Sequence, residues 1–460
     1  MPFFPFPRLA IAGLSGGGGK TLVSLALAVT ARRAGLAVRT FKKGPDYIDA
    51  AWLAWASGHP TRNLDSWLMG FPKAVESFAR TACAEGLNVI EGNRGLYDGV
   101  DARGTHSTAA LAKALDAPVI LVVDATKATR TVAASVLGCQ KLDAEVKIAG
   151  VVLNRAGGAR HQALIREAVE ADCGIPVLGA IPKLAGENLL PERHLGLVTP
   201  AEHQNAGLEN RLLELVAPHL DVEGLLEISA NAGGLAASEA RRRQDRQRYL
   251  IGYLKDSVFT FYYPENLEAL EAAGANLLPI DSLRATELPA GIDALYIGGG
   301  FPETHAQTLS GNRSLLQSLK QRATAGLPVY AECGGLMLLS RAMHIDGRTY
   351  PMAGVLPCEV ELCPRPQGHG YVELHIEREN PFFSTGLSIK GHEFHYSRIV
   401  NADSMPRPVC SVSRGTGCGG GDAIVSGNVW ASYTHIHALA TPEWAAGLMA
   451  AARRHASILV

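Results

Sequence analysis

The chain has little of three things that would narrow its class at once: aromatic residues, charge of one sign and long hydrophobic runs. Aromatic residues make up 6% of its 460 residues, and 43 Lys and Arg stand against 44 Asp and Glu. This balance excludes a global basic field for binding nucleic acid. The longest aliphatic runs, such as Val119–Val123, are far shorter than the ~18 residues of a membrane span. We therefore expect neither nucleic acid nor a membrane as a partner.

Cysteine is also scarce, with eight residues in the chain. The nearest pair is Cys358 and Cys363, and no matching pair follows at zinc-site spacing. Such a pattern is typical of ordinary thiols in a reducing compartment. The segment Met1–Arg8 is broken by prolines and lacks the charged start of a signal peptide. The sequence thus predicts a cytoplasmic protein.

Glycine, by contrast, is abundant, with 49 residues, while 47% of the chain is hydrophobic and 19% is charged. This composition is that of a folded chain, and its length suggests two or three domains. The glycines follow no fixed period, which excludes collagen. They either loosen linkers or lie where backbone must approach a ligand closely.

Short β-rich runs alternate with helical stretches, which predicts an α/β fold with a mostly parallel sheet covered on both faces. In the first half, the expected strands are Leu9–Gly13, Ala37–Thr40, Asn88–Glu91, Val119–Asp124 and Ile148–Asn154. A small, flexible composition and then a basic run, Arg241–Arg248, separate them from a second α/β series that starts at Tyr249. We therefore predict domains over 1–230 and 249–460, joined by a linker over 231–248.

A phosphate-binding loop is predicted at Gly13–Thr21, which follows a strand and opens a helix. Its glycines let backbone N–H groups turn toward phosphate oxygens, and the helix N-terminus adds its dipole. Lys20 would face the terminal phosphates, and the Thr21 hydroxyl would bind Mg²⁺. The loop is one residue longer than the usual spacing. The predicted nucleotide-binding residues are Ser15, Gly16, Gly17, Gly18, Gly19, Lys20 and Thr21.

Carboxylates at strand ends would complete a Mg²⁺ site, because Mg²⁺ prefers hard oxygen ligands and open α/β sheets bind ligands at this edge. Glu91 closes one strand, and Asp46 follows another. Asp46 could instead cap the next helix. Asp124 also ends a strand, and the sequence leaves open whether it serves a site or a cap. We predict Thr21, Asp46 and Glu91 as the metal residues.

Cys333 lies between a strand ending at Ala331 and a helical stretch, in the arrangement of a nucleophile elbow. Such a turn exposes the thiol, and the N–H groups of Gly334 and Gly300 would face an oxyanion. A late histidine, His435, would be the base. The alternative for Cys333 by itself is an inert buried thiol, but the two glycine clusters and the late histidines favour a nucleophile.

These segments together resemble the cobyrinic acid a,c-diamide synthase family over nearly the whole chain. The matching segments are GGGGKT (Gly16–Thr21), KKGPDYID (Lys42–Asp49), GLYDG (Gly95–Gly99), VVLNR (Val151–Arg155), PERHLGLV (Pro191–Val198), GGGFPE (Gly298–Glu303), AECGGLMLL (Ala331–Leu339), GHEFHYS (Gly391–Ser397) and SYTHIH (Ser432–His437). The resemblance implies a dethiobiotin-synthetase-like P-loop domain followed by a class I glutamine amidotransferase domain.

The resemblance also implies a reaction and its partners: glutamine, ATP with Mg²⁺, and a corrinoid polycarboxylate. Glutamine would be hydrolysed at Cys333 through a thioester, and ammonia would cross an internal path. ATP would phosphorylate the a and c acetates in turn, and ammonia would displace the phosphate. A homodimer is expected from the family. The substrate residues would be Tyr47, Asp49, Leu96, Tyr97 and Asp98, and Asn154 would bind the nucleobase.

Some features depart from the family pattern, and several alternatives stay open. Many class I amidotransferases carry Glu two residues after the histidine, where this chain has His437. The acid that supports His435 is therefore unassigned, and His437 is the second candidate for the base. Asn93-Arg94 replaces an expected hydrophobic pair. The macrocycle could also be hydrogenobyrinic acid or nickel sirohydrochlorin. Cobyric acid synthase, a ParA-like regulatory ATPase and a stand-alone glutaminase fit the motifs less well.

Overall fold

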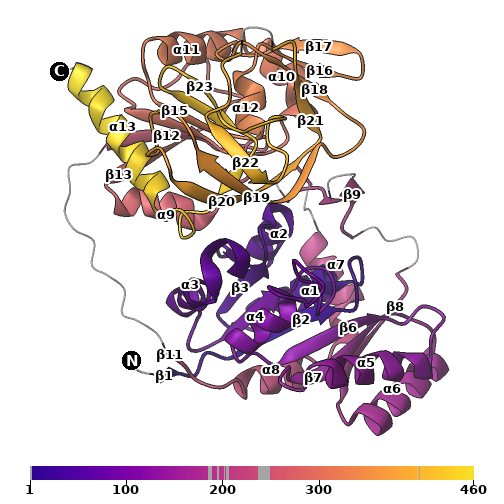
Figure 1. Ribbon diagram of the computed structural model, residues 1–460. Coiled ribbons are helices and arrows are strands. Elements are labelled where there is room, and N and C mark those ends of the chain that lie inside the picture. Colours follow the sequence, from indigo (N-terminus) through magenta and orange to yellow (C-terminus); the bar gives the residue numbers. More distant parts are fainter. Residues whose placement is uncertain are drawn as a thin grey trace. The chain divides into compact units, whose positions relative to one another are not determined.

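The computed structural model describes residues 3–184, 189–193, 196–200, 202–203, 207–236, 249–402 and 405–459. The chain forms two compact units, Met1–Arg241 and Arg242–Val460 (Figure 1). The predicted basic run Arg241–Arg248 lies outside the described residues, as do residues 194 and 195 of the segment Pro191–Val198. Among the described helices, none is both long enough and apolar enough to cross a membrane.

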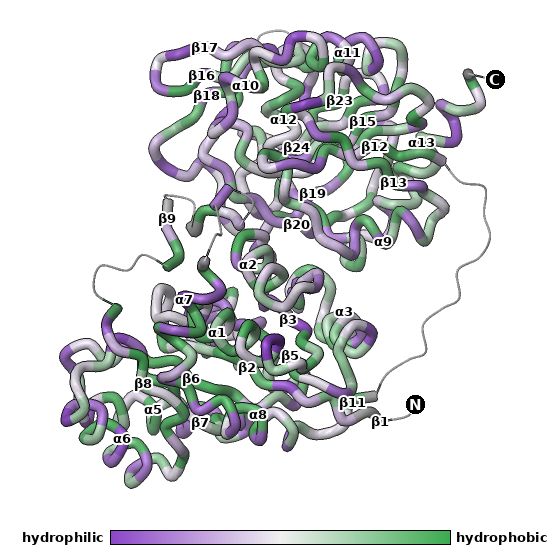
Figure 2. The backbone as a smooth tube through the Cα atoms, turned by 180° about the vertical axis from the view of Figure 1, so that it is seen from behind, coloured by the Kyte–Doolittle hydropathy of each residue, from purple (hydrophilic) through white to green (hydrophobic). Residues whose placement is uncertain are grey.

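A seven-stranded sheet forms the centre of the first unit, in the order β4-β3-β5-β2-β6-β7-β8. All of its neighbouring strands are parallel, which confirms the predicted fold class. Its central strands are hydrophobic along most of their length (Figure 2), and their residues are buried on both faces of the sheet. The strands are β2 (Arg8–Gly13), β3 (Val38–Lys43), β4 (Arg62–Leu64), β5 (Leu87–Glu91), β6 (Val119–Asp124), β7 (Ile148–Ala156) and β8 (Val177–Pro182).

Four helices of this unit begin at a side chain that accepts hydrogen bonds from their first free N–H groups, namely Asp46, Asp65, Ser107 and Asp221. The helices of the unit are α1 (Lys20–Arg33), α2 (Tyr47–Ser57), α3 (Ser66–Thr81), α4 (Thr108–Ala114), α5 (Arg130–Leu142), α6 (Ala159–Cys173), α7 (Leu208–Leu215) and α8 (Val222–Ala230), with a 3-10 turn at Ala217–His219. Short pairings join β1 (Phe3–Phe4) to β11 (Leu235–Ala236), and β9 (Glu192–Arg193) to β10 (Gly196–Leu197).

The small segment after α8, which the composition predicts to be a flexible linker, is anchored as far as β11. Arg8 in β2 is fully buried, and its Nη2 donates to the Gly233 carbonyl at 2.7 Å. The same guanidinium donates to the carbonyls of Leu115 and Phe6. A buried cation needs this many acceptors, because water no longer solvates it. Residues 231–236 are therefore part of the packed first unit.

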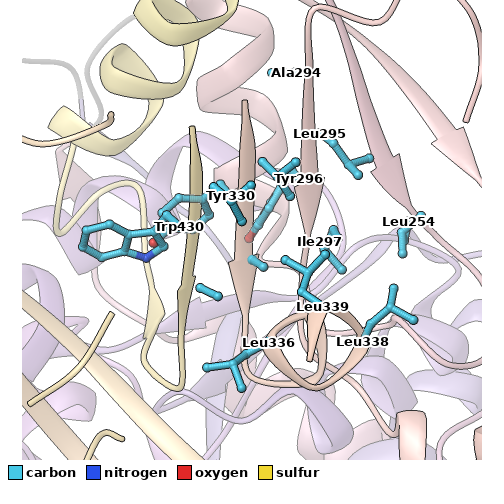
Figure 3. Close-up of a cluster of buried hydrophobic side chains, with 14 of the residues drawn as sticks. Leu254, Ala294, Leu295, Tyr296, Ile297, Tyr330, Leu336, Leu338, Leu339 and Trp430 are labelled. Carbon is cyan, nitrogen blue, oxygen red and sulfur yellow. The ribbon is translucent and has the colours of Figure 1, made fainter. Parts of the chain in front are cut away.

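The second unit has a six-stranded sheet in the order β13-β12-β14-β15-β24-β23, parallel except for the edge strand β23. Aromatic and aliphatic side chains such as Tyr296, Tyr330 and Trp430 fill the space beside it (Figure 3). The strands are β12 (Tyr249–Leu254), β13 (Ala275–Ile280), β14 (Ala294–Ile297), β15 (Val329–Glu332), β23 (Ile424–Ser426) and β24 (Val429–Ser432).

Two further four-stranded sheets, ordered β17-β16-β18-β21 and β22-β19-β20-β25, extend this unit. Their strands are β16 (Ala342–Ile345), β17 (Arg348–Pro351), β18 (Glu359–Leu362), β19 (Gly368–Ile376), β20 (Ser388–His395), β21 (Ser397–Val400), β22 (Cys410–Arg414) and β25 (His435–Ile436). The helices are α9 (Pro264–Ala272), α10 (Ala306–Gly311), α11 (Arg313–Thr324), α12 (Gly334–Leu339) and α13 (Glu443–Leu459), with a 3-10 turn at Pro302–His305.

The glycine-rich segment Gly415–Gly421 is held in place by a buried carboxylate. The buried Glu393 carboxylate accepts hydrogen bonds from the N–H groups of Thr416, at 2.6 Å, and Gly417, at 2.8 Å. The glycines here allow tight turns with positive φ rather than a loose chain. This segment is therefore a fixed part of the second unit.

Candidate active sites

The predicted phosphate loop connects β2 to α1, and its lysine forms a hydrogen bond with the loop backbone. Lys20 Nζ donates to the Ser15 carbonyl at 2.8 Å. Gly19 has φ 99°, and a Cβ there would collide with the Asn154 amide, which donates to the Gly18 carbonyl at 3.0 Å. Asn154 thus contacts the loop backbone from the end of β7. The loop places backbone N–H groups at the start of α1, where an anion is favoured.

A buried charge cluster lies next to this loop, and its central residue was missed by sequence reasoning. Lys42 Nζ lies 2.6 Å from Glu91 Oε1 and 2.6 Å from Asp49 Oδ2. Thr21 Oγ1 donates to the same Glu91 oxygen at 3.1 Å. Burial opposes the charge of Lys42, but the carboxylates of Asp49 and Glu91 outweigh it and raise the pKa of Lys42. The sequence feature that could have identified Lys42 is its position inside a buried strand, because β3 extends to Lys43.

Asp46 is the N-cap of α2, where its Oδ1 accepts from the N–H groups of Ile48 and Asp49 at 2.9 Å. Burial and then the Asp49 carboxylate raise the pKa of Asp46 to about 7. Among the described residues, no group of three or more His, Cys, Asp or Glu side chains surrounds a metal position. The Thr21 hydroxyl and the Glu91 carboxylate nonetheless fit Mg²⁺, which takes one or two protein oxygens and otherwise binds phosphates and water.

The predicted substrate residues lie on two segments beside the loop. Tyr47 and Asp49 are in the first turn of α2, and the Leu96 N–H donates to the Gly13 carbonyl at 2.7 Å. The Tyr97 hydroxyl donates to the Cys139 carbonyl of α5 at 2.6 Å, and Asp98 accepts from the Gly95 N–H. The structure therefore brings Asp49 and Leu96 to the loop, while the Tyr97 hydroxyl bonds to α5. Asp124, left open by the sequence, caps the turn at Thr126 and pairs with Arg155.

In the second unit, Cys333 lies between β15 and α12 with φ 47° and ψ −99°. This φ is positive, which a non-glycine residue adopts only when its surroundings enforce it. The Cys333 N–H donates to the Ser432 carbonyl of β24 at 2.7 Å, which holds the turn. Burial, and next the Glu303 carboxylate, raise the pKa of the Cys333 thiol. A neutral thiol of this kind needs a base to become a nucleophile.

The predicted oxyanion residues come together beside this thiol. A Cβ on Gly334 would lie 3.1 Å from the backbone nitrogen of Gly300. The loop that follows β14 therefore lies directly against the first turn of α12. Any side chain at Gly334 would press on that nitrogen. The two backbone segments predicted to supply oxyanion N–H groups thus meet next to Cys333.

His435 and His437 belong to one short segment but have different surroundings. His435 Nδ1 lies 3.5 Å from Glu332 Oε2, and its Nε2 would lie 3.2 Å from a Cβ on Gly299. His437 is fully buried, with Nε2 3.7 Å from Glu265 Oε2 and Nδ1 accepting from the Leu439 N–H. His435 is thus the one whose ring edge faces the glycine loop. The acid beside it, Glu332, directly precedes the nucleophile, and sequence reasoning did not assign it this position.

These features define the chain as a P-loop nucleotide-binding unit followed by a glutamine amidotransferase unit. Residues 9–198 match the CobQ/CobB/MinD/ParA nucleotide binding domain, and residues 250–443 match the CobB/CobQ-like glutamine amidotransferase domain.

Proteins of similar sequence identify the family within this class. A protein of Magnetococcus marinus is 42% identical over 455 residues, covering 97% of each chain. One of Caldanaerobacter subterraneus is 42% identical, covering 85% of this chain and 86% of its own, and one of Methanothermobacter thermautotrophicus is 40% identical, covering 95% and 98%. All three are named cobyrinate a,c-diamide synthase. This chain belongs to the cobyrinate a,c-diamide synthase family.

Proposed function

We propose that the protein uses ATP and glutamine to convert the a and c acetate carboxylates of cobyrinic acid into amides. The main support for this proposal is one observation: the same chain contains a strained, buried Cys333 in an amidotransferase unit and a phosphate loop with its lysine. A stand-alone glutaminase has no use for that loop, and a regulatory ATPase has none for the thiol. The names of the relatives supply the substrate.

In the glutaminase step, His435 would take the Cys333 proton as the sulfur attacks the side-chain amide carbon of glutamine. The N–H groups of Gly300 and Gly334 would stabilise the resulting oxyanion. His435 then returns the proton to the departing ammonia, and water hydrolyses the thioester to glutamate and free thiol. This sequence regenerates both residues.

In the synthetase step, a carboxylate must be activated, because it resists direct attack by ammonia. Lys20 and the loop N–H groups would hold the nucleotide phosphates, and Lys42 would keep the Glu91 and Asp49 carboxylates in place. Bound Mg²⁺, held by Thr21 and Glu91 with Asp46 nearby, would neutralise phosphate charge. Transfer of the γ-phosphoryl group gives an acyl phosphate and ADP. Ammonia then displaces phosphate and leaves the amide.

Several finer assignments belong to the same proposal. Asn154 is proposed to bind the nucleobase, and the residues proposed to bind the macrocycle are Tyr47, Asp49, Leu96, Tyr97 and Asp98. All eight cysteines are free, which supports a cytoplasmic location. The homodimer and the domain boundaries 1–230 and 249–460 stay predictions.

The test is product analysis by mass spectrometry with cobyrinic acid, hydrogenobyrinic acid and nickel sirohydrochlorin, each with ATP–Mg²⁺ and glutamine. We expect a diamide from cobyrinic acid. Cys333→Ala should abolish the glutamine-dependent product but retain the product made with ammonium chloride. Conversion of none of the three macrocycles would defeat the proposal, and preferred use of another would reassign the substrate.

A further inference from the structure

The residue directly before the nucleophile, Glu332, lies at the junction of the thiol and the histidine. It is the last residue of β15, it is fully buried, and both of its oxygens face groups around His435. Its Oε1 accepts from the Ile436 N–H at 3.2 Å. Its Oε2 accepts from the Tyr296 hydroxyl at 3.2 Å and lies 3.5 Å from His435 Nδ1. One carboxylate therefore contacts the histidine ring and the backbone that follows it.

We propose that Glu332 is the positioning residue of the glutaminase site, holding His435 with Nε2 toward the thiol and stabilising its protonated form. This inference rests on the proposed glutamine hydrolysis. A carboxylate at Nδ1 keeps a proton there and leaves Nε2 free to accept one. The Nε2 edge faces Gly299, in the loop whose next residue, Gly300, lies against Gly334 beside Cys333. The 3.5 Å separation of Glu332 Oε2 from His435 Nδ1 is long, and such bonds commonly shorten when substrate binds.

The position of this acid explains how the site can work without Glu two residues after the histidine. At that place stands His437, whose ring lies near a different carboxylate, Glu265. β15 and β24 pair in parallel with Glu332 opposite Ser432, and His435 in β25 follows Ser432 shortly afterwards, so the Glu332 carboxylate reaches its ring. The strand that presents the nucleophile thus also presents the acid. Glu265 provides a matched comparison, since it is a buried glutamate beside a histidine of the same segment.

The experiment measures glutamine hydrolysis in the full chain for the wild type and for Glu332→Gln, Glu332→Asp and Glu265→Gln. Glu332→Gln preserves shape and should lower kcat by about 10²- to 10³-fold, with KM within about threefold. Glu332→Asp retains the charge and should recover part of kcat. Glu265→Gln should hydrolyse glutamine with a kcat close to that of the wild type. Near-ultraviolet circular dichroism reports folding in each variant, and ammonium-dependent product formation reports that the first unit is intact.

A wild-type kcat in Glu332→Gln, an equal loss in Glu265→Gln, or no recovery in Glu332→Asp would each overturn the inference. If circular dichroism shows that Glu332→Gln is misfolded, the variant Tyr296→Phe decides. It removes the hydroxyl that donates to Oε2 and accepts from Asn266 Nδ2, so a several-fold lower kcat at unchanged KM supports the role, and an unchanged kcat overturns it. A wild-type protein that hydrolyses no glutamine would instead defeat the proposed function.

Discussion

Lys42 Nζ lies 2.6 Å from Glu91 Oε1, and both side chains are withdrawn from solvent. A charge pair buried this deeply is stable only while both partners are present, because each compensates the desolvation of the other. Asp49 adds a second carboxylate at the same nitrogen. This lysine therefore compensates both carboxylates on the acidic side of the nucleotide site.

We expect Lys42→Met to destabilise the first unit by about 3–5 kcal/mol, since it leaves buried carboxylates without a counter-ion. Urea denaturation with a probe in the first unit measures the change. The double variant Lys42→Met/Glu91→Gln should regain part of the loss, because it removes one uncompensated charge. A single variant as stable as the wild type would show that the pair contributes little.

Gly19→Ala should weaken nucleotide binding by at least tenfold, about 1.4 kcal/mol. The new Cβ would collide with the Asn154 amide, and φ 99° is unfavourable for alanine. Gly158→Ala is the control, because Gly158 has φ −65° and open space around its Cα. Calorimetric titration with an ATP analogue compares the two. Glutamine hydrolysis should be retained in both, and equal nucleotide affinity in both would contradict the role of Asn154 as a close neighbour.

Asp422 holds the backbone that leads into His435. Its fully buried carboxylate accepts from the N–H groups of Tyr433 and Thr434 at 3.1 Å and from the Thr434 hydroxyl at 2.6 Å. We expect Asp422→Ala to cost about 3 kcal/mol and to remove glutaminase activity, because several buried donors lose their acceptor. Glu361→Ala breaks only an exposed ion pair with Arg398 and should cost less than about 1 kcal/mol. Similar losses in the two variants would refute this ranking.

His392 should make the second unit sensitive to acid. Burial, and next the neighbouring His435, lower the pKa of His392 well below 6.5. Below pH 6.5 the unfolded chain therefore binds a proton that the native ring does not, so stability falls as the pH drops. His392→Gln removes this proton uptake. The variant's loss of stability relative to the wild type should thus be smaller at pH 5 than at pH 8, by up to about 2 kcal/mol. Chemical denaturation at both pH values measures the difference in free energy of unfolding between variant and wild type. The same difference at pH 5 and pH 8 would contradict the prediction.

The α/β class was predictable because its signals are local: apolar strands alternate with helices, and a glycine-rich turn follows the first strand. Cys333 could be proposed as a nucleophile for the same reason, since the strand, the small residues and the helix are contiguous. The composition of residues 231–236 suggests flexibility, but a buried Arg8, far earlier in the chain, binds the Gly233 carbonyl.

By itself, the sequence determined the order of the elements, the phosphate loop with Lys20, and the family to which the chain belongs. Only the tertiary structure decided which charged side chains contact one another. Lys42 lies between Glu91 and Asp49 because three segments converge at one sheet edge. Glu332 lies beside His435 because β15 pairs in parallel with β24, and His435 follows β24 in the chain. Burial gives these contacts their importance, because a charge removed from water depends on the partner that folding supplies.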